Sequence, residues 1–232
     1  MKEPVVAIVP AAGIGERFGR DTNKPFATLG DKPLIIWTVA TLQNLPEITE
    51  IIPVVKETDI KLCSRLFEEY AITKIKRVAP GGRERQDSVF HGLNLIRHRK
   101  SVVLVHDAVR PLIEPSLIQS ALQQLNGCDG VVVGVPLKDT VKEVRDGIVR
   151  NTPKRDLLWA AQTPQIFPYQ VLYDAYEKAM ADSFYTTDDS ALVEMNGGVI
   201  KMVQGSYANI KVTTPEDLLI AEVFLKMKRG SA

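Results

Sequence analysis

The sequence has 232 residues, of which 45% are hydrophobic, 25% charged and 6% aromatic, and its net charge is +1. A globular chain of this length and composition buries roughly 70% of its unfolded surface, so it needs neither disulfides nor a metal to fold. The near-neutral charge excludes a large positive surface for nucleic acid or an anionic membrane, so any anion-binding site must be local.

The two cysteines, Cys63 and Cys128, lie far apart and form no C-x-x-C motif. Together with three scattered histidines they give no zinc-ligand spacing, so no metal held by the protein alone is expected. No apolar run approaches the roughly 18 residues of a membrane helix, and residues 5–9 are too short for a signal peptide. We therefore expect a cytoplasmic protein with neither a membrane nor a nucleic-acid partner.

Short β-branched runs alternate with longer amphipathic segments along the first 135 residues. The runs are continuous rather than alternating in polarity, which is typical of strands covered by helices on both faces. Strands are predicted at residues 5–9, 51–55, 102–105 and 131–135. Helices are predicted at 34–45, 59–70, 87–98 and 115–125, with Asp87 and Pro115 as start signals for the last two. This order predicts an α/β fold with a doubly wound, mostly parallel (Rossmann-like) sheet.

The alternation breaks after residue 136. Two short strands, at 141–144 and 148–150, flank Asp146-Gly147, which predicts a β-hairpin. An isolated hairpin is marginally stable in water, so this one folds back on the sheet, lies against a second subunit or is an exposed ribbon.

Helices are predicted again at 169–180 and 188–195, followed by a strand at 199–203. A last helix begins at Thr214-Pro215, with Thr214 as the N-cap and two acidic residues in its first turn. No linker or internal repeat separates these segments. We interpret residues 1–232 as one domain with a hairpin excursion.

A glycine-rich segment, Pro10-Ala11-Ala12-Gly13-Ile14-Gly15-Glu16-Arg17, directly follows the first strand. Small residues there let a ligand approach backbone N–H groups that can hold phosphate oxygens. The dinucleotide fingerprint fails because Phe18 stands where glycine or alanine is needed, and no P-loop Gly-Lys-Ser/Thr follows. Arg17 and Lys24 add two cations, which suits a polyphosphate. The alternatives are a purely structural turn and two solvated charges.

This segment, followed by Lys24-Pro25, resembles the opening of the nucleotidyltransferases that join a sugar or polyol phosphate to a nucleoside triphosphate. Further motifs follow in the matching order: Gly81-Gly82-x-Glu84-Arg85-x-Asp87-Ser88-Val89, Val105-His106-Asp107-Ala108-Val109-Arg110-Pro111, Val135-Pro136-Leu137-Lys138-Asp139-Thr140, Trp159-x-x-Gln162-Thr163-Pro164-Gln165, Thr187-Asp188-Asp189 and Asn209-Ile210-Lys211. Over nearly the whole chain, this ordered set is similar to the 2-C-methyl-D-erythritol 4-phosphate cytidylyltransferase family.

The resemblance implies transfer of CMP from CTP to a polyol phosphate, methylerythritol phosphate, with Mg²⁺ held mainly by the CTP phosphates. It implies that Arg17 and Lys24 stabilise the transition state, and that Arg155 and Lys211 position the acceptor phosphate. It also implies a homodimer whose hairpin arms, at about residues 137–158, interlock and complete a shared site that includes Thr140. The other implied substrate-binding residues are Ala11, Ala12, Gly13, Gly15, Gly82, Ser88, Asp107, Ala108, Arg110 and Thr163.

Some of these residues also have a structural interpretation. Asp107 ligates magnesium or its water shell, or caps the turn after its strand. Ser88 contacts the base or ribose, or merely begins a helix. His106 is expected to be a packed, hydrogen-bonded residue, since an acceptor phosphate is largely a dianion at neutral pH and needs no general base. Asp188-Asp189 is first interpreted as a helix N-terminus.

Three other functions stay open. A ribitol-5-phosphate cytidylyltransferase shares much of the pattern, and a sugar-1-phosphate nucleotidyltransferase is a weaker alternative. A nucleotide-sensing or NAD-binding protein would explain Gly13 and Gly15, but not Arg17, Lys24 and Lys211 together.

Overall fold

The computed structural model describes residues 3–13 and 24–230. Within these residues, seven strands form one sheet: β1 (Val5–Pro10), β4 (Ile48–Val55), β5 (Ala79–Pro80), β6 (Val102–Val105), β7 (Gly130–Pro136), β10 (Trp159–Pro168) and β11 (Ile200–Gln204). Their order is β11-β7-β10-β6-β1-β4-β5, and β10 runs antiparallel to both of its neighbours, whereas the other pairs are parallel. The predicted α/β class with a mostly parallel sheet is confirmed.

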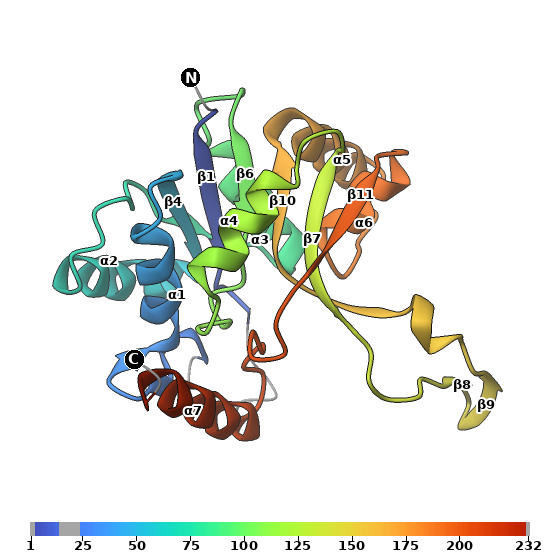
Figure 1. Ribbon diagram of the computed structural model, residues 1–232. Coiled ribbons are helices and arrows are strands. Elements are labelled where there is room, and N and C mark those ends of the chain that lie inside the picture. The colour runs from blue at the N-terminus through green and yellow to red at the C-terminus, as the bar shows by residue number, and fades with distance from the viewer. Residues whose placement is uncertain (1–2, 14–23, 231–232) are drawn as a thin grey trace.

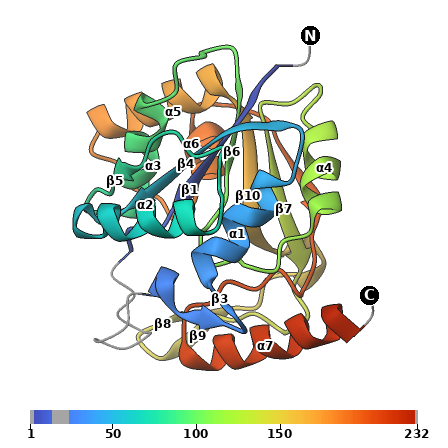
Figure 2. The same cartoon turned by 90° about the vertical axis from the view of Figure 1, so that its left-hand side faces the viewer.

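Helices cover both faces of this sheet (Figure 1). Apolar side chains of α1 (Leu34–Gln43), α2 (Ile60–Glu69) and α4 (Pro115–Gln123) pack in the core of one face. Those of α3 (Arg85–Asn94), α5 (Tyr169–Ala181) and α6 (Asp189–Met195) pack in the core of the other. Figure 2 views the sheet from its side, with α3 and α5 on one side and α1 and α4 on the other. The sheet is therefore doubly wound, as predicted.

The last helix, α7 (Pro215–Gly230), lies below the carboxyl ends of the parallel strands in Figure 1. Its buried residues Ala221 and Leu225 pack in a third core with Leu29 of the short strand β2 (Thr28–Leu29), which pairs with β3 (Lys32–Pro33). Pro215 is the first helical residue, as predicted, and Thr214 Oγ1 accepts a hydrogen bond from the Asp217 N–H (3.3 Å). In the described part of the chain, no helix combines the length and the apolar character that crossing a bilayer requires.

The predicted first residues of three helices can be compared with the structure. α3 begins at Arg85 rather than Asp87, so the predicted start is wrong: Asp87 is the third helical residue and accepts a hydrogen bond from the backbone N–H of the N-cap Glu84 (2.8 Å). A carboxylate three residues into a helix satisfies a donor at its start, which is why Asp87 resembled an N-cap. Pro115 begins α4 as predicted, and Asp188 caps α6 by accepting from the Ala191 N–H (3.2 Å).

Strand β10 is absent from the predicted elements because polar residues interrupt its apolar run. Gln162, Thr163 and Gln165 are nevertheless buried, each at most 7% exposed. Their side chains are satisfied by partners far along the chain, as when Gln162 Nε2 donates to the Ser206 carbonyl (2.9 Å). Buried polar groups with such partners are compatible with a central strand.

The predicted hairpin is present as β8 (Glu143–Arg145) and β9 (Ile148–Asn151). Asp146 and Gly147, with φ of 53° and 74°, make the left-handed turn that suits a two-residue hairpin. We use "arm" for residues 137–158, which project from the end of β7 away from the body of the molecule (Figure 1). Four of its apolar side chains are 54–78% exposed: Val144, Ile148, Val149 and Leu157.

Candidate active site

An open cleft of about 820 Å³ lies where β1, β4 and β6 end. The carboxyl ends of parallel strands are the usual ligand site of an open α/β sheet, and the volume is that of a small-molecule pocket. Its walls are residues 10–13 at the end of β1, residues 82–85 at the start of α3, and side chains that include Lys24, Asp107 and Lys211. Lys24 begins the short 3-10 helix η2 (Lys24–Phe26).

The cleft brings together many of the predicted site residues: Ala11, Ala12, Gly13, Lys24, Gly82, Ser88, Asp107 and Lys211. Ala108, Arg110 and Thr163 are buried beside it. Thr140 and Arg155 do not line it; both are exposed in the arm, and Arg155 Nη1 donates to the Lys138 carbonyl (2.8 Å). Gly15 and Arg17 lie outside the described residues.

The loop before α3 approaches the glycine segment closely. A Cβ added to Gly81 would lie 2.1 Å from the Ala12 Cβ, and one added to Gly82 would lie 2.2 Å from the Asp87 Cβ. The Gly82 N–H donates to Ser88 Oγ (3.1 Å), and the Ser88 hydroxyl donates to the Glu84 carbonyl (3.1 Å). Ser88 is thus inside α3, not its start, and holds the loop in place.

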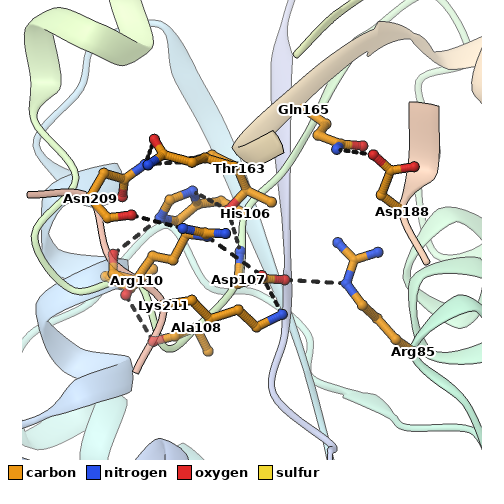
Figure 3. A network of polar contacts seen from close by, with 12 residues as sticks. Arg85, His106, Asp107, Ala108, Arg110, Thr163, Gln165, Asp188, Asn209 and Lys211 are labelled. Atoms are coloured by element: carbon orange, nitrogen blue, oxygen red, sulfur yellow. Dashed lines mark hydrogen bonds and ion pairs between the residues drawn. The ribbon is translucent and has the colours of Figure 1, made fainter. Parts of the chain in front are cut away.

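Asp107, just after β6, has a carboxylate surrounded by cations (Figure 3). Its Oδ1 lies 3.2 Å from Arg85 Nε, and its Oδ2 lies 2.9 Å from Lys211 Nζ and 3.7 Å from Arg110 Nε. Burial alone would raise the pKa of this carboxyl, but Arg85, Lys211 and Arg110 outweigh burial and hold the pKa far below its usual range. Asp107 is therefore a fixed anion at the cleft, and its side chain does not cap the turn.

Hydrogen bonds of Arg110 and Asn209 hold the segment that carries Lys211 in place. Arg110 Nη1 donates to the Asn209 carbonyl (2.8 Å), and Asn209 Nδ2 donates to the Thr163 carbonyl (2.9 Å). The Ala108 carbonyl accepts a hydrogen bond from Thr38 Oγ1 (2.9 Å). These buried bonds fix the two segments that carry Asp107 and Lys211.

His106 is packed and hydrogen-bonded, as predicted. It is fully buried; the Thr163 hydroxyl lies 3.0 Å from its Nδ1, and its Nε2 lies 3.3 Å from the Arg110 carbonyl. Since that carbonyl can only accept, Nε2 donates and Nδ1 accepts from the hydroxyl. Burial, the largest effect, lowers the pKa of His106 to about 4. Both ring nitrogens are thus occupied, and His106 cannot act as a general base.

This burial makes stability depend on pH. A histidine whose pKa falls from 6.5 to about 4 on folding stabilises the protein fully above pH 6.5 and loses that contribution as the pH falls toward 4. The loss by about pH 5 is roughly 2 kcal/mol. We expect the free energy of unfolding, measured with urea, to be lower at about pH 5 than at about pH 7.5 by this amount. His106→Gln should reduce the difference, whereas the exposed control His98→Gln should not; an unchanged pH dependence in His106→Gln would contradict the assignment.

Arg85 and Lys56 also line the cleft without having been assigned a role from the sequence. Arg85 stands in a motif that carries the family resemblance, and its place at the first position of a helix after a glycine loop is the one signal that could have indicated it. Lys56 follows β4 and has only its position at a strand end. Asp189 lies outside the cleft lining but holds the Arg85 guanidinium with both oxygens (3.0 and 2.9 Å).

Lys24 and Lys211 line a cleft whose walls include residues 10–13 of the glycine segment and the loop before α3. Among the described residues, no cluster of three or more histidine, cysteine or acidic side chains could hold a metal. Backbone-lined walls and nearby cations at the carboxyl ends of the strands of a doubly wound sheet are typical of α/β proteins that bind nucleotides or other phosphate-bearing ligands.

Comparisons with known proteins agree with this class and show the family to which the chain belongs. The model of the 2-C-methyl-D-erythritol 4-phosphate cytidylyltransferase family matches residues 5–227. The enzymes of that name from Syntrophotalea carbinolica and Geotalea uraniireducens are 43% and 44% identical, over 95–96% of this chain and 96–97% of theirs. The crystal structure of 4-diphosphocytidyl-2C-methyl-D-erythritol synthase from Anaerococcus prevotii superposes with a TM-score of 0.86 at 35% identity, covering 97% of this chain and 96% of that one. The chain belongs to this cytidylyltransferase family and is a nucleotidyltransferase.

Proposed function

We propose that the protein transfers CMP from CTP to 2-C-methyl-D-erythritol 4-phosphate, a step of isoprenoid precursor biosynthesis in the non-mevalonate pathway. An oxygen of the acceptor phosphate attacks the α-phosphorus of CTP, the bond from that phosphorus to the bridging oxygen breaks, and pyrophosphate leaves. The observation that carries this proposal is the cleft in which Lys24 and Lys211 face the glycine segment and the loop before α3.

Charge repulsion is the main obstacle to this reaction. The acceptor phosphate is largely a dianion near neutral pH, so it needs no general base, but it must approach a triphosphate of the same sign. Lys24 and Arg17 are proposed to neutralise the charge that develops on the phosphate oxygens. Lys211 and Arg155 are proposed to hold the acceptor phosphate.

The nucleotide is proposed to lie between the glycine segment and the loop before α3. Glycines at positions 13 and 15, without side chains, would leave room for phosphates. Ala11, Ala12 and Gly82 are proposed to present backbone to the base, and Ser88 holds the loop of Gly82. Asp107, Ala108, Arg110 and Thr163, all buried near the end of β6, are proposed to form the floor of the site.

The chemistry of Asp107 fits a magnesium ion held mainly by the CTP phosphates. Mg²⁺ is commonly bound by one or two carboxylates together with substrate phosphates, and Asp107 is an ionised carboxylate that lines the cleft. When bound, the ion would neutralise phosphate charge and orient the triphosphate.

We further propose a cytoplasmic homodimer. Residues 1–232 would form one nucleotidyltransferase domain, and the arm would bring Thr140 and Arg155 to the partner's acceptor site. The exposed apolar side chains of the two-stranded hairpin support this assignment, because such a hairpin is marginally stable alone and its apolar surface favours a covering partner.

Substrate choice tests the proposed reaction. We expect pyrophosphate release with CTP and methylerythritol phosphate, and at least a hundredfold lower kcat/KM with UTP, because backbone acceptors near Ala11, Ala12 and Gly82 would lose the exocyclic amine of cytosine. Ribitol 5-phosphate should be the poorer acceptor, in line with the name of the matched family. Equal efficiency with CTP and UTP would contradict the base assignment, and a preference for ribitol phosphate would replace the acceptor.

A further inference from the structure

Arg85 joins three structural elements at the edge of the cleft, and the reaction above assigns it no role. As the first residue of α3, it directly follows the glycine-containing loop. Its Nε donates to Asp107 Oδ1 (3.2 Å), at the end of β6, and its Nη1 and Nη2 donate to the two oxygens of Asp189 (3.0 and 2.9 Å), at the start of α6. Figure 3 shows Arg85 to the right of Asp107 and the end of the Lys211 side chain below it.

Asp189 fixes the direction of this guanidinium. Its side chain is fully buried, its Oδ1 also accepts a hydrogen bond from the Tyr176 hydroxyl, and its backbone N–H donates to Gln165 Oε1 (3.0 Å). The guanidinium is planar and binds both Asp189 oxygens, so the orientation of Nε is set as well. A lysine ammonium could neutralise Asp189 but lacks this fork geometry.

The two oxygens of Asp107 have different partners. Oδ1 faces Arg85, whereas Oδ2 faces Lys211 (2.9 Å) and, at 3.7 Å, Arg110 Nε. The Lys211 side chain is 37% exposed and lines the cleft, so its ammonium can reach an incoming phosphate. If Lys211 turns to that phosphate, Arg85 is the contact that still holds Asp107 Oδ1.

We propose that Arg85 is a positioning residue: its fork on Asp189 holds the Asp107 carboxylate in one orientation, with Oδ2 toward Lys211. It thereby fixes the spacing between the glycine-containing loop at the start of α3 and the cation for the acceptor phosphate. This inference rests on the proposed reaction. It requires that Arg85 acts through Asp107 and not on phosphate directly; its Nε–H already donates to Asp107, and one N–H of each terminal nitrogen donates to Asp189.

A double-mutant cycle with CTP and methylerythritol phosphate tests this. We expect Arg85→Lys to lower kcat by about ten- to a hundredfold, as loss of a supporting contact does, while the KM for CTP changes less than about threefold. In an Asp107→Asn background the same change should lower kcat by less than about threefold, because its effect passes through Asp107. The matched control is Arg77→Lys. Arg77 also forms an ion pair, with Glu50 at 2.7 Å, and its side chain is 27% exposed, against 28% for Arg85. The kinetics of Arg77→Lys should be unchanged.

If thermal melting shows that Arg85→Lys does not fold, the double variant Arg85→Gln/Asp189→Asn takes its place in the cycle. This variant removes both charges of the Arg85–Asp189 pair, and we expect the same loss of kcat from it. Full additivity with Asp107→Asn, or kinetics equal to those of Arg77→Lys, would overturn the inference. A loss confined to CTP affinity, measured by calorimetry, would show direct phosphate contact and also overturn it. An inactive wild-type chain would contradict the proposed reaction and this inference together, whereas an active one with an unaffected Arg85→Lys contradicts this inference alone.

Discussion

Lys24→Ala should lower turnover by about a hundred- to a thousandfold, because removing one preorganised donor to developing charge costs roughly 3–4 kcal/mol of transition-state stabilisation. Lys24 lines the cleft at the start of η2, beside the glycine segment. Arg17→Ala is predicted to have an effect of the same size. The measurement is kcat from pyrophosphate release at saturating CTP and acceptor.

Folding has to be separated from chemistry in these variants. The matched control is Lys61→Ala, which removes the same side chain from an exposed position on α2. We expect the control to keep wild-type turnover and all three variants to keep the wild-type melting temperature. Near-normal turnover of well-folded Lys24→Ala or Arg17→Ala would count against the role assigned to that residue.

Most of the sheet is predictable from the sequence because buried parallel strands leave continuous β-branched runs. Residues 102–105 and 131–135 were predicted in this way and lie within β6 and β7. β10 leaves no such run, since Gln162, Thr163 and Gln165 are buried through hydrogen bonds to distant residues. Local periodicity cannot reveal a strand whose burial depends on partners elsewhere in the chain.

The same limit applies to the site. Residues 10–13 and Lys24 stand at recognisable positions after the first strand, and they line one cleft, as predicted. The Arg85–Asp189 pair spans 104 positions in the sequence, and nothing near either residue indicates the other. Asp188-Asp189 was interpreted as a helix N-terminus, which is correct for Asp188 and incomplete for Asp189, whose carboxylate holds a guanidinium.

Removing the arm should have the second large effect on turnover, because activity is expected to depend on dimerisation through the arm. Lys138 Nζ lies 3.6 Å from the centroid of the Tyr207 ring, and the Tyr207 hydroxyl donates to the Pro136 carbonyl (2.7 Å), so the base of the arm is anchored to the body. Replacing residues 139–150 by a short Gly/Ser connection removes Thr140 and most of the projecting hairpin. We expect monomers that still bind CTP but turn over the acceptor poorly. Sedimentation equilibrium and calorimetry measure the two properties.

Mixing two inactive variants tests whether the arm completes the partner's site. Arg155→Ala removes the arm cation proposed for the acceptor phosphate, and Lys24→Ala removes a cation of the cleft. If Arg155 acts across the interface, a mixed dimer has one site with both of these cations intact. Random exchange makes half of the dimers mixed, so activity should recover to about one quarter of the wild-type value in a two-fold symmetric dimer. Each variant alone, treated identically, is the control. A fully active monomer would refute the shared site, and absence of recovery after verified subunit exchange would place Arg155 in its own subunit's site.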